Sequence, residues 1–186
     1  MDDVKADSLY TDSLYKTIPS VATDKGWYVH ARGDHPEIRA KFFELIRRLN
    51  GYKAHVVIAK KDFSVFKDRY NSDPIEFYFD VLHHLLDGKL QHGDSSYKLY
   101  LSQRGNNSLH RFEKAVTKAL KANDLNSVTA QCNLEIVPGK EMPELSIVDY
   151  LIWAVQRKLL TGESRYFDAM RDKFETITNL YGEGVK

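Results

Sequence analysis

Cysteine and long apolar runs are nearly absent from this sequence. Its 186 residues include one cysteine, Cys132, which excludes an internal disulfide and a cysteine-rich zinc module. No apolar run approaches the ~20 residues that cross a membrane. The acidic start, Met1-Asp2-Asp3, lacks the apolar segment of a signal peptide. We therefore expect a cytoplasmic protein that does not enter a membrane.

An excess of charge of either sign is also lacking. The chain has 27 Lys and Arg residues against 26 Asp and Glu residues, which leaves a formal net charge of +1. This balance disfavours a polybasic nucleic-acid-binding protein but permits a local basic groove. The hydrophobic share of 42% is typical of a globular protein, and the length suits about one domain.

Motifs of three familiar enzyme classes are missing. The chain has no Gly-x-x-x-x-Gly-Lys-Ser/Thr phosphate loop and no Gly-x-Gly-x-x-Gly after a strand. It also lacks a Gly-x-Ser-x-Gly turn, which disfavours a serine hydrolase. An unrelated small-molecule α/β enzyme is therefore the least favoured of three functional hypotheses.

Apolar periodicity and turn residues predict alternating strands and helices. Residues 1–26 are polar and are predicted to form a weakly ordered arm, and residues 27–186 are predicted to form a single domain. The expected elements are strands at 27–30, 54–59, 97–102 and 127–134, and helices at 34–50, 73–90, 108–122, 145–160 and 164–180. This alternation predicts an α/β fold in which helices flank a mixed central sheet.

One carboxylate on the helix predicted at 145–160 suggests a function. Asp149 lies in the first turn, where the helix dipole favours a negative charge. It stands beside an apolar stripe formed by Val148, Ile152, Val155 and Leu159. A carboxylate at the edge of a core needs a partner, which could be Mg²⁺, an Arg side chain or a backbone N–H. The spacing alone favours a structural or helix-capping Asp149.

The residues around Asp149 resemble a known family motif. Segment 145–155, Leu-Ser-Ile-Val-Asp-Tyr-Leu-Ile-Trp-Ala-Val, is similar to the closing motif of the bacterial and phage family called domain of unknown function 3800. Segment His30–Arg39 resembles the His, Asp and Arg residues with which that family begins a helix. The resemblance covers about residues 27–170 and implies a ribonuclease-H-like fold.

The resemblance implies a metal-dependent nuclease, linked to mobile elements or phage defence. Such chemistry uses several carboxylates to hold Mg²⁺ or Mn²⁺, which activates water for attack on a phosphodiester. Asp149 is carried over from the family as the catalytic and metal-binding residue. Glu135 and Asp34 are further candidate metal ligands, for which loop solvation and a helix cap are the respective alternatives.

Basic residues at predicted strand ends, or beside Asp149, are candidates for contacts with nucleic-acid phosphates. These residues are Lys60, Lys61, Arg104 and Arg157. Scattered, solvated surface charge is the alternative interpretation. Arg39 could brace the turn between His30 and Asp34, or it could be a surface residue of its helix.

The chain departs from the family near its N-terminus. Family members begin with a strand that carries Asp-Glu-Ser, and no such strand is recognisable here. The strand at 97–102 ends in Ser102, and Arg104 follows, where many members have Asp. We therefore expect a fold that is incomplete at its N-terminus, in a truncated homologue or in a catalytically inactive interaction module. An exposed sheet edge would then favour a homodimer.

Overall fold

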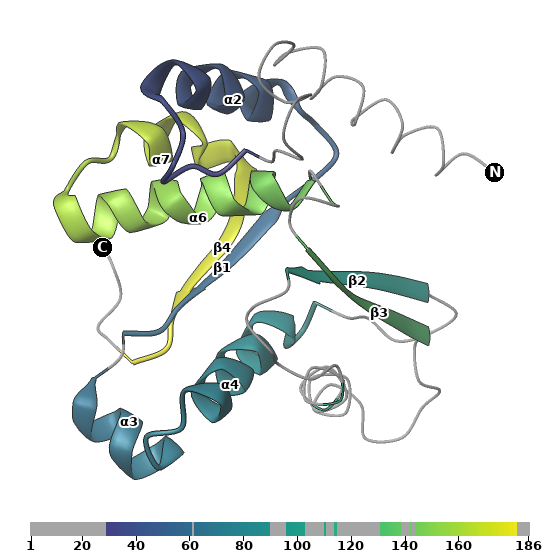
Figure 1. Ribbon diagram of the computed structural model, residues 1–186, viewed down its shortest axis with the longest axis vertical. Helices are drawn as coiled ribbons and strands as arrows, with labels where there is room; N and C mark the ends of the chain where they lie inside the picture. The colour runs from purple at the N-terminus through teal and green to yellow at the C-terminus, as the bar shows by residue number, and fades with distance from the viewer. Residues whose placement is uncertain are drawn as a thin grey trace. The chain divides into compact units, whose positions relative to one another are not determined.

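Figure 1 shows the computed structural model of the chain. The structure describes residues 29–60, 62–89, 96–102, 110, 114, 131–138, 142 and 144–181. Within these ranges it is a mixed α/β structure with five α-helices and four strands, which confirms the predicted class. None of the described helices combines the length and the hydropathy needed to cross a bilayer. The predicted arm at residues 1–26 lies outside the described residues.

Most described helices and strands lie where the sequence predicts them. They are α2 (Pro36–Arg48), β1 (Ala54–Ile58), α4 (Pro74–Leu86), β2 (Ser96–Ser102), β3 (Gln131–Val137) and α6 (Glu144–Thr161). His110 and Lys114 are helical and fall within the helix predicted at 108–122, whose other residues are not described. Val29 and His30 have no regular structure, so the described half of the strand predicted at 27–30 is wrong.

The sequence analysis missed one helix between β1 and α4. This is α3 (Phe63–Tyr70). Its N-cap is Asp62, whose side chain accepts hydrogen bonds from the amides of Ser64 and Val65. With eight residues, α3 is too short for a strong apolar periodicity, so the N-cap residue Asp62 was its main signal in the sequence.

The helix predicted at 164–180 is confirmed only at its start and is wrong from residue 170 on. The chain forms α7 (Arg165–Ala169), then a 3-10 turn, η2 (Arg171–Lys173), and then strand β4 (Phe174–Asn179). The consecutive β-branched residues Thr176, Ile177 and Thr178 fit a pleated strand better than a helix. The pairing of β4 with β1 overrides the weaker helical pattern.

The four strands form two separate pairs, β1 with β4 and β2 with β3. The β2–β3 pair is parallel, with Ser96 opposite Gln131 and Ser102 opposite Val137. Near the start of the pair, the ring of His55 on β1 contacts the hydroxyl of Thr176 on β4 at 2.9 Å. At its other end, the amide of Leu180, which follows β4, donates to the carbonyl of Ile58 on β1. Since these contacts advance in the same direction, this pair is also parallel. A single mixed sheet, and with it a ribonuclease-H-like fold or a homodimer through its edge, stays a prediction.

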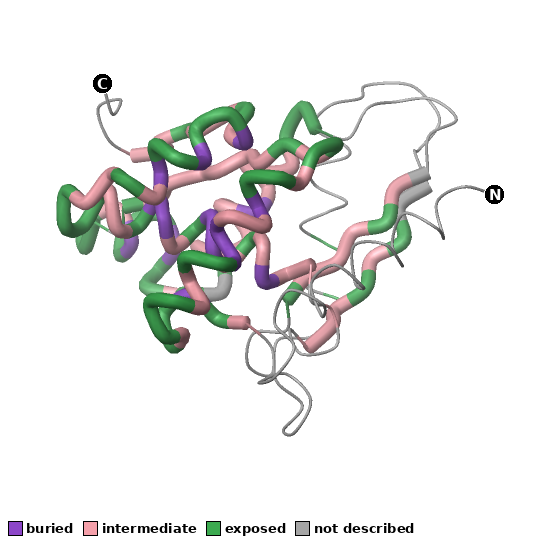
Figure 2. Tube along the Cα trace, turned by 90° about the horizontal axis from the view of Figure 1, so that it is seen from above, coloured by how far each residue is buried: buried purple, intermediate pink, exposed green. Residues whose placement is uncertain are grey.

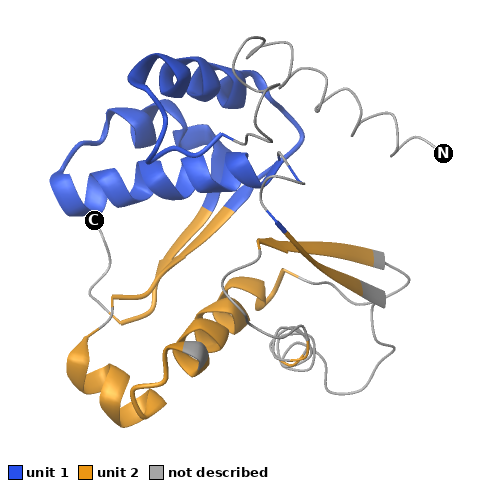
Figure 3. Cartoon of the chain, in the orientation of Figure 1, with its two compact units in different colours: residues 1–54, 138–175 blue, residues 55–137, 176–186 orange. Residues whose placement is uncertain are grey.

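The chain divides into two compact units, which Figure 3 distinguishes by colour. Unit 1 comprises residues 1–54 and 138–175, and unit 2 comprises residues 55–137 and 176–186. Each unit therefore joins segments that are far apart in the sequence.

The core of unit 1 is largely aromatic, and its buried positions are purple in Figure 2. Phe42 and Phe43 of α2 contact the ring of Tyr150 on α6, with centroid distances of 4.3 and 5.1 Å. Phe42, Ile46 and Tyr150 are fully buried. Large aromatic side chains contribute most of the apolar area that a small core can bury, so these contacts determine which face of α6 turns inward.

The apolar stripe along α6 is mostly exposed. Of its four residues only Val155 is buried, whereas Val148, Ile152 and Leu159 are exposed. The buried face of α6 is formed instead by Ser146, Tyr150, Leu151, Ala154 and Val155. The face of α6 that packs against the aromatic side chains of α2 is therefore not the aliphatic stripe. Asp149 lies at the edge of the packed face.

Unit 2 has its own apolar cluster. Leu82 of α4 is buried, and partly buried residues of α4, β2 and β3 pack around it. A second group joins α3, α4 and the residue Tyr181, because the carboxylate of Asp80 accepts hydrogen bonds from the Tyr70 and Tyr181 hydroxyls at 2.6 and 2.9 Å.

Truncation of the aromatic core should destabilise the protein strongly. Phe42→Ala removes a side chain with 0% exposure from the contact between α2 and α6, and we expect a loss of about 3–5 kcal/mol in the free energy of unfolding. Leu160→Ala is the control, because Leu160 is 81% exposed and its truncation should stay within about 0.5 kcal/mol. Urea unfolding followed by circular dichroism measures both variants. Equal losses would show that α2 and α6 do not pack in this way.

Candidate functional site

The first described residues form a tight turn that precedes α2. The amides of Gly33 and Asp34 each donate to the carbonyl of His30 at 3.0 Å, and the amide of His30 donates to Asp34 Oδ2 at 2.9 Å. The carboxylate of Asp34 thus links the end of the turn back to the amide at its start, that of His30. The N-cap of α2 is His35 and not Asp34, so a helix cap is the wrong interpretation of Asp34.

Asp149 binds this turn from the first half of α6. Its Oδ2 atom accepts a hydrogen bond from the amide of Ala31 at 2.8 Å, across 118 positions of sequence. The Nδ1 atom of His30 lies 3.2 Å from the same oxygen, and the side chains of His30 and Asp149 remain 47% and 38% exposed. The structure therefore forms a solvent-accessible pair of an imidazole and a carboxylate.

Two groups contact the Nδ1 atom of His30. The amide of Arg32 also lies within hydrogen-bond distance of Nδ1, at 3.4 Å. That contact needs Nδ1 as an acceptor, whereas the carboxylate of Asp149 needs it as a donor. The two contacts therefore suit different states of the ring: the Arg32 amide suits an unprotonated Nδ1, and the Asp149 carboxylate suits a protonated one.

Asp34 has a second partner, Tyr150, which follows Asp149 in the chain. The hydroxyl of Tyr150 donates to Asp34 Oδ2 at 2.5 Å. Burial raises the pKa of Asp34, and this effect exceeds the opposite effects of the hydrogen bonds from Tyr150 and His30. Burial also raises the pKa of Tyr150, as does the neighbouring carboxylate. Tyr150 therefore remains a protonated donor.

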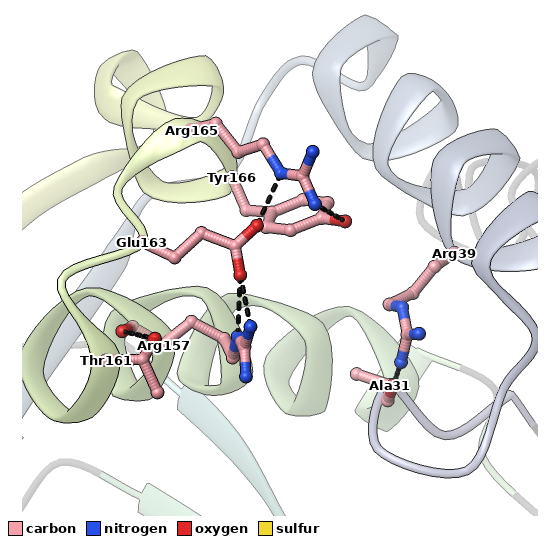
Figure 4. Close-up of polar contacts among 7 residues, drawn as sticks. All are labelled: Ala31, Arg39, Arg157, Thr161, Glu163, Arg165 and Tyr166. Carbon is pink, nitrogen blue, oxygen red and sulfur yellow. Dashed lines mark hydrogen bonds and ion pairs between the residues drawn. The ribbon is translucent and has the colours of Figure 1, made fainter.

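Arg39 holds the other side of the Ala31 peptide. Its Nη1 atom donates to the carbonyl of Ala31 at 2.5 Å, a contact drawn in Figure 4. Its guanidinium carbon lies 4.9 Å from the centroid of the Trp153 ring. The Ala31 peptide is thus fixed at its N–H by Asp149 and at its carbonyl by Arg39. Of the two interpretations of Arg39 from the sequence, the brace of the turn is confirmed.

Arg157 lies two turns after Asp149 and pairs with Glu163. Its Nε atom donates to Glu163 Oε2 at 2.9 Å, and its Nη2 atom contacts the same oxygen (Figure 4). Arg165 reaches the other oxygen of Glu163 at 2.5 Å. The hydrogen bond from Arg157 is the main reason that the pKa of Glu163 lies below its usual value. The sequence singled out Arg157 but gave no signal for Glu163, which lies past the helix end at Gly162.

The remaining candidate residues belong to unit 2 or lie outside the described residues. Glu135 is exposed on β3 in unit 2, where it accepts a hydrogen bond from Asn133 at 3.4 Å. Lys60 is also exposed and also belongs to unit 2. Lys61 and Arg104 lie outside the described residues. The structure therefore brings together Asp34, Asp149 and Arg157 in unit 1.

The donor set can be compared with what Mg²⁺ needs. Mg²⁺ takes oxygen ligands in a near-octahedral arrangement, and a nuclease site uses several carboxylates. Within the described ranges, no group of three or more His, Cys, Asp or Glu residues is arranged to hold a metal ion. One oxygen of each of Asp34 and Asp149 already accepts hydrogen bonds from the turn. The described residues alone therefore do not fit a Mg²⁺ centre.

No protein-family model, curated protein or solved structure matches this chain.

The raised pKa of Asp34 predicts a pH-dependent stability. A carboxyl whose pKa is higher in the folded state stabilises the fold below its ordinary value of 3.8, and that contribution is lost as the pH rises through the folded-state pKa. The advantage of the wild type over Asp34→Asn in unfolding free energy should therefore shrink from acid toward neutral pH. Urea unfolding at a series of pH values measures it. Asp68→Asn, at an exposed position of α3, is measured alongside as the control for the substitution itself. An advantage that grows with pH would contradict the burial of Asp34.

Proposed function

We propose that this chain is a ribonuclease-H-like protein that hydrolyses phosphodiester bonds of nucleic acid, with Asp149 at the centre of its site. One observation carries the proposal. Two of the segments that carry the family resemblance, His30–Arg39 and 145–155, lie far apart in the sequence, yet hydrogen bonds join Ala31 to Asp149 and Asp34 to Tyr150 in unit 1. A purely local pattern in either segment would not require this meeting.

The exposed pair of His30 and Asp149 supports proton transfer. An imidazole beside a carboxylate can accept a proton at a ring nitrogen, as a general base does with an attacking water. Asp149 and Asp34 fix the turn that carries this imidazole. The dependence on Mg²⁺ or Mn²⁺ that the family resemblance implies stays a prediction, and it is one arm of the test below.

A second function is favoured by the same hydrogen bonds. One oxygen of Asp34 accepts a hydrogen bond from the amide of His30, and one oxygen of Asp149 accepts one from the amide of Ala31. Both contacts have a structural role. A catalytically inactive interaction module would keep these contacts because they hold the turn. Such a module would bind nucleic acid or another partner without cutting it.

Asp149→Asn is the variant that tests the hydrolase. We expect the wild type to cleave single- or double-stranded DNA or RNA, and the variant to lose about 10²–10⁴-fold in rate, because it loses the negative charge that orients His30. The assay uses labelled oligonucleotides in Mg²⁺, Mn²⁺ or EDTA, with reaction products resolved by size. Asp68→Asn, on α3 of unit 2, is the matched control and should keep the full rate.

Each outcome of this assay separates the two functions. Circular dichroism must first show that Asp149→Asn is folded. Binding of nucleic acid by a folded wild type that cuts none of the four substrates would exclude the hydrolase in favour of the interaction module. Cleavage that Asp149→Asn retains in full would place the reaction elsewhere in the chain.

A further inference from the structure

A group of arginine and aromatic side chains lies beside the Asp149 site. We call it the arginine–aromatic cluster, and it consists of Arg39, Trp153, Arg157, Glu163, Arg165 and Tyr166. Trp153 follows Asp149 by four positions on α6, and Arg157 follows Trp153 by four more. Residues at this spacing lie on the same side of a helix, so the cluster continues the side of α6 that carries Asp149.

Three guanidinium groups gather around two rings that touch. The guanidinium carbons of Arg39 and Arg157 lie 4.9 and 5.6 Å from the centroid of Trp153. That of Arg165 lies 4.7 Å from the ring of Tyr166. The Trp153 and Tyr166 rings meet edge to face with centroids 4.9 Å apart. Contacts with aromatic faces hold guanidinium planes in defined orientations, so these groups are organised before any ligand arrives.

Positive charge exceeds negative charge in this cluster. The cluster has three guanidiniums and one carboxylate, that of Glu163, which pairs with Arg157 and Arg165. Arg39 has no carboxylate within ion-pair distance among the described residues, and its Nε atom is buried without a hydrogen-bond partner there. The six residues of the cluster therefore carry two more positive charges than negative charges.

Glu163 presents its carboxylate to the arginines as a phosphate would. Two nitrogens of Arg157 point at one of its oxygens, and Arg165 takes the other. Arginine recognises carboxylate and phosphate with the same fork of N–H donors. A phosphate could therefore replace the Glu163 carboxylate without a change in the arginine positions.

We propose that the arginine–aromatic cluster binds the phosphate backbone of a nucleic-acid strand beside Asp149, and that Glu163 occupies the phosphate position until the strand binds. This inference rests on the proposed function, since that function supplies the nucleic acid. In this arrangement the cluster is the contact surface for the strand, and Glu163 competes with the phosphate of the strand for the arginines.

The competitor is tested by a variant that removes only its charge. Glu163→Gln should bind a fluorescein-labelled single-stranded oligonucleotide about fivefold more tightly than the wild type at low salt, because a carboxylate no longer competes with the phosphate. Fluorescence anisotropy measures the dissociation constant. A closely matched control exists on α2, where Glu44 pairs with both Arg47 and Arg48 away from any ring contact described for them. Glu44→Gln should leave the affinity unchanged.

The arginines are tested by their salt dependence. Arg157→Gln and Arg165→Gln should each weaken binding several-fold, and each should lower the slope of log affinity against log salt by roughly 0.7–0.9, the value for one lost phosphate contact. Arg47→Gln is the control and should change neither quantity. Thermal unfolding establishes that every variant is folded before its affinity is compared.

The outcomes distinguish this inference from the proposed function. If the wild type binds and the Arg157 and Arg165 variants bind equally well, the cluster is not the phosphate site, while the proposed function still stands. If Glu163→Gln binds more weakly than the wild type, Glu163 joins α6 to α7 and does not compete with a strand, which overturns that part of the inference. A wild type that neither binds nor cleaves any of the four nucleic acids contradicts the proposed function and this inference together.

Discussion

The hydrogen bond from the amide of Ala31 to the carboxylate of Asp149 is the contact on which the site depends. It ties a turn that precedes α2 to the helix α6, which lies more than a hundred residues later. Without it, the imidazole of His30 would have no fixed carboxylate beside it. Arg39 reinforces the contact, because it holds the carbonyl of the same residue and rests against Trp153 on α6.

The site and the core of unit 1 lie on two sides of helix α6. Asp149 and Tyr150 are adjacent, and an α-helix places neighbouring residues about 100° apart around its axis. Tyr150 therefore points its ring into the aromatic core, while its hydroxyl reaches Asp34 at the turn. Asp149 lies at the edge of the buried face of α6, where it contacts the backbone of the turn and is partly exposed to solvent. Packing of α2 against α6 is thus what brings segments 30–39 and 145–155 together.

The sequence predicts the local elements of this structure better than its long-range contacts. Helix α6 ends at Thr161, directly before Gly162, which adopts a left-handed φ of 72°. Periodicity located α6 but not its buried face, because the aromatic rings of α2 outweigh the aliphatic stripe. Strand β4 was missed because its partner β1 lies far away in the sequence. The partner of Asp149 proved to be a backbone N–H, one of three that its position allowed, and only the folded chain could decide among them.

The central claim is the Ala31–Asp149 contact, and nuclear magnetic resonance of the ¹⁵N-labelled full chain tests it most directly. An amide that donates to a carboxylate is a charge-assisted hydrogen-bond donor. We predict that the Ala31 amide proton resonates downfield and exchanges slowly with solvent, and that both features vanish in Asp149→Asn. An Ala31 amide that exchanges at the rate of an unstructured chain and is the same in both proteins would contradict the account.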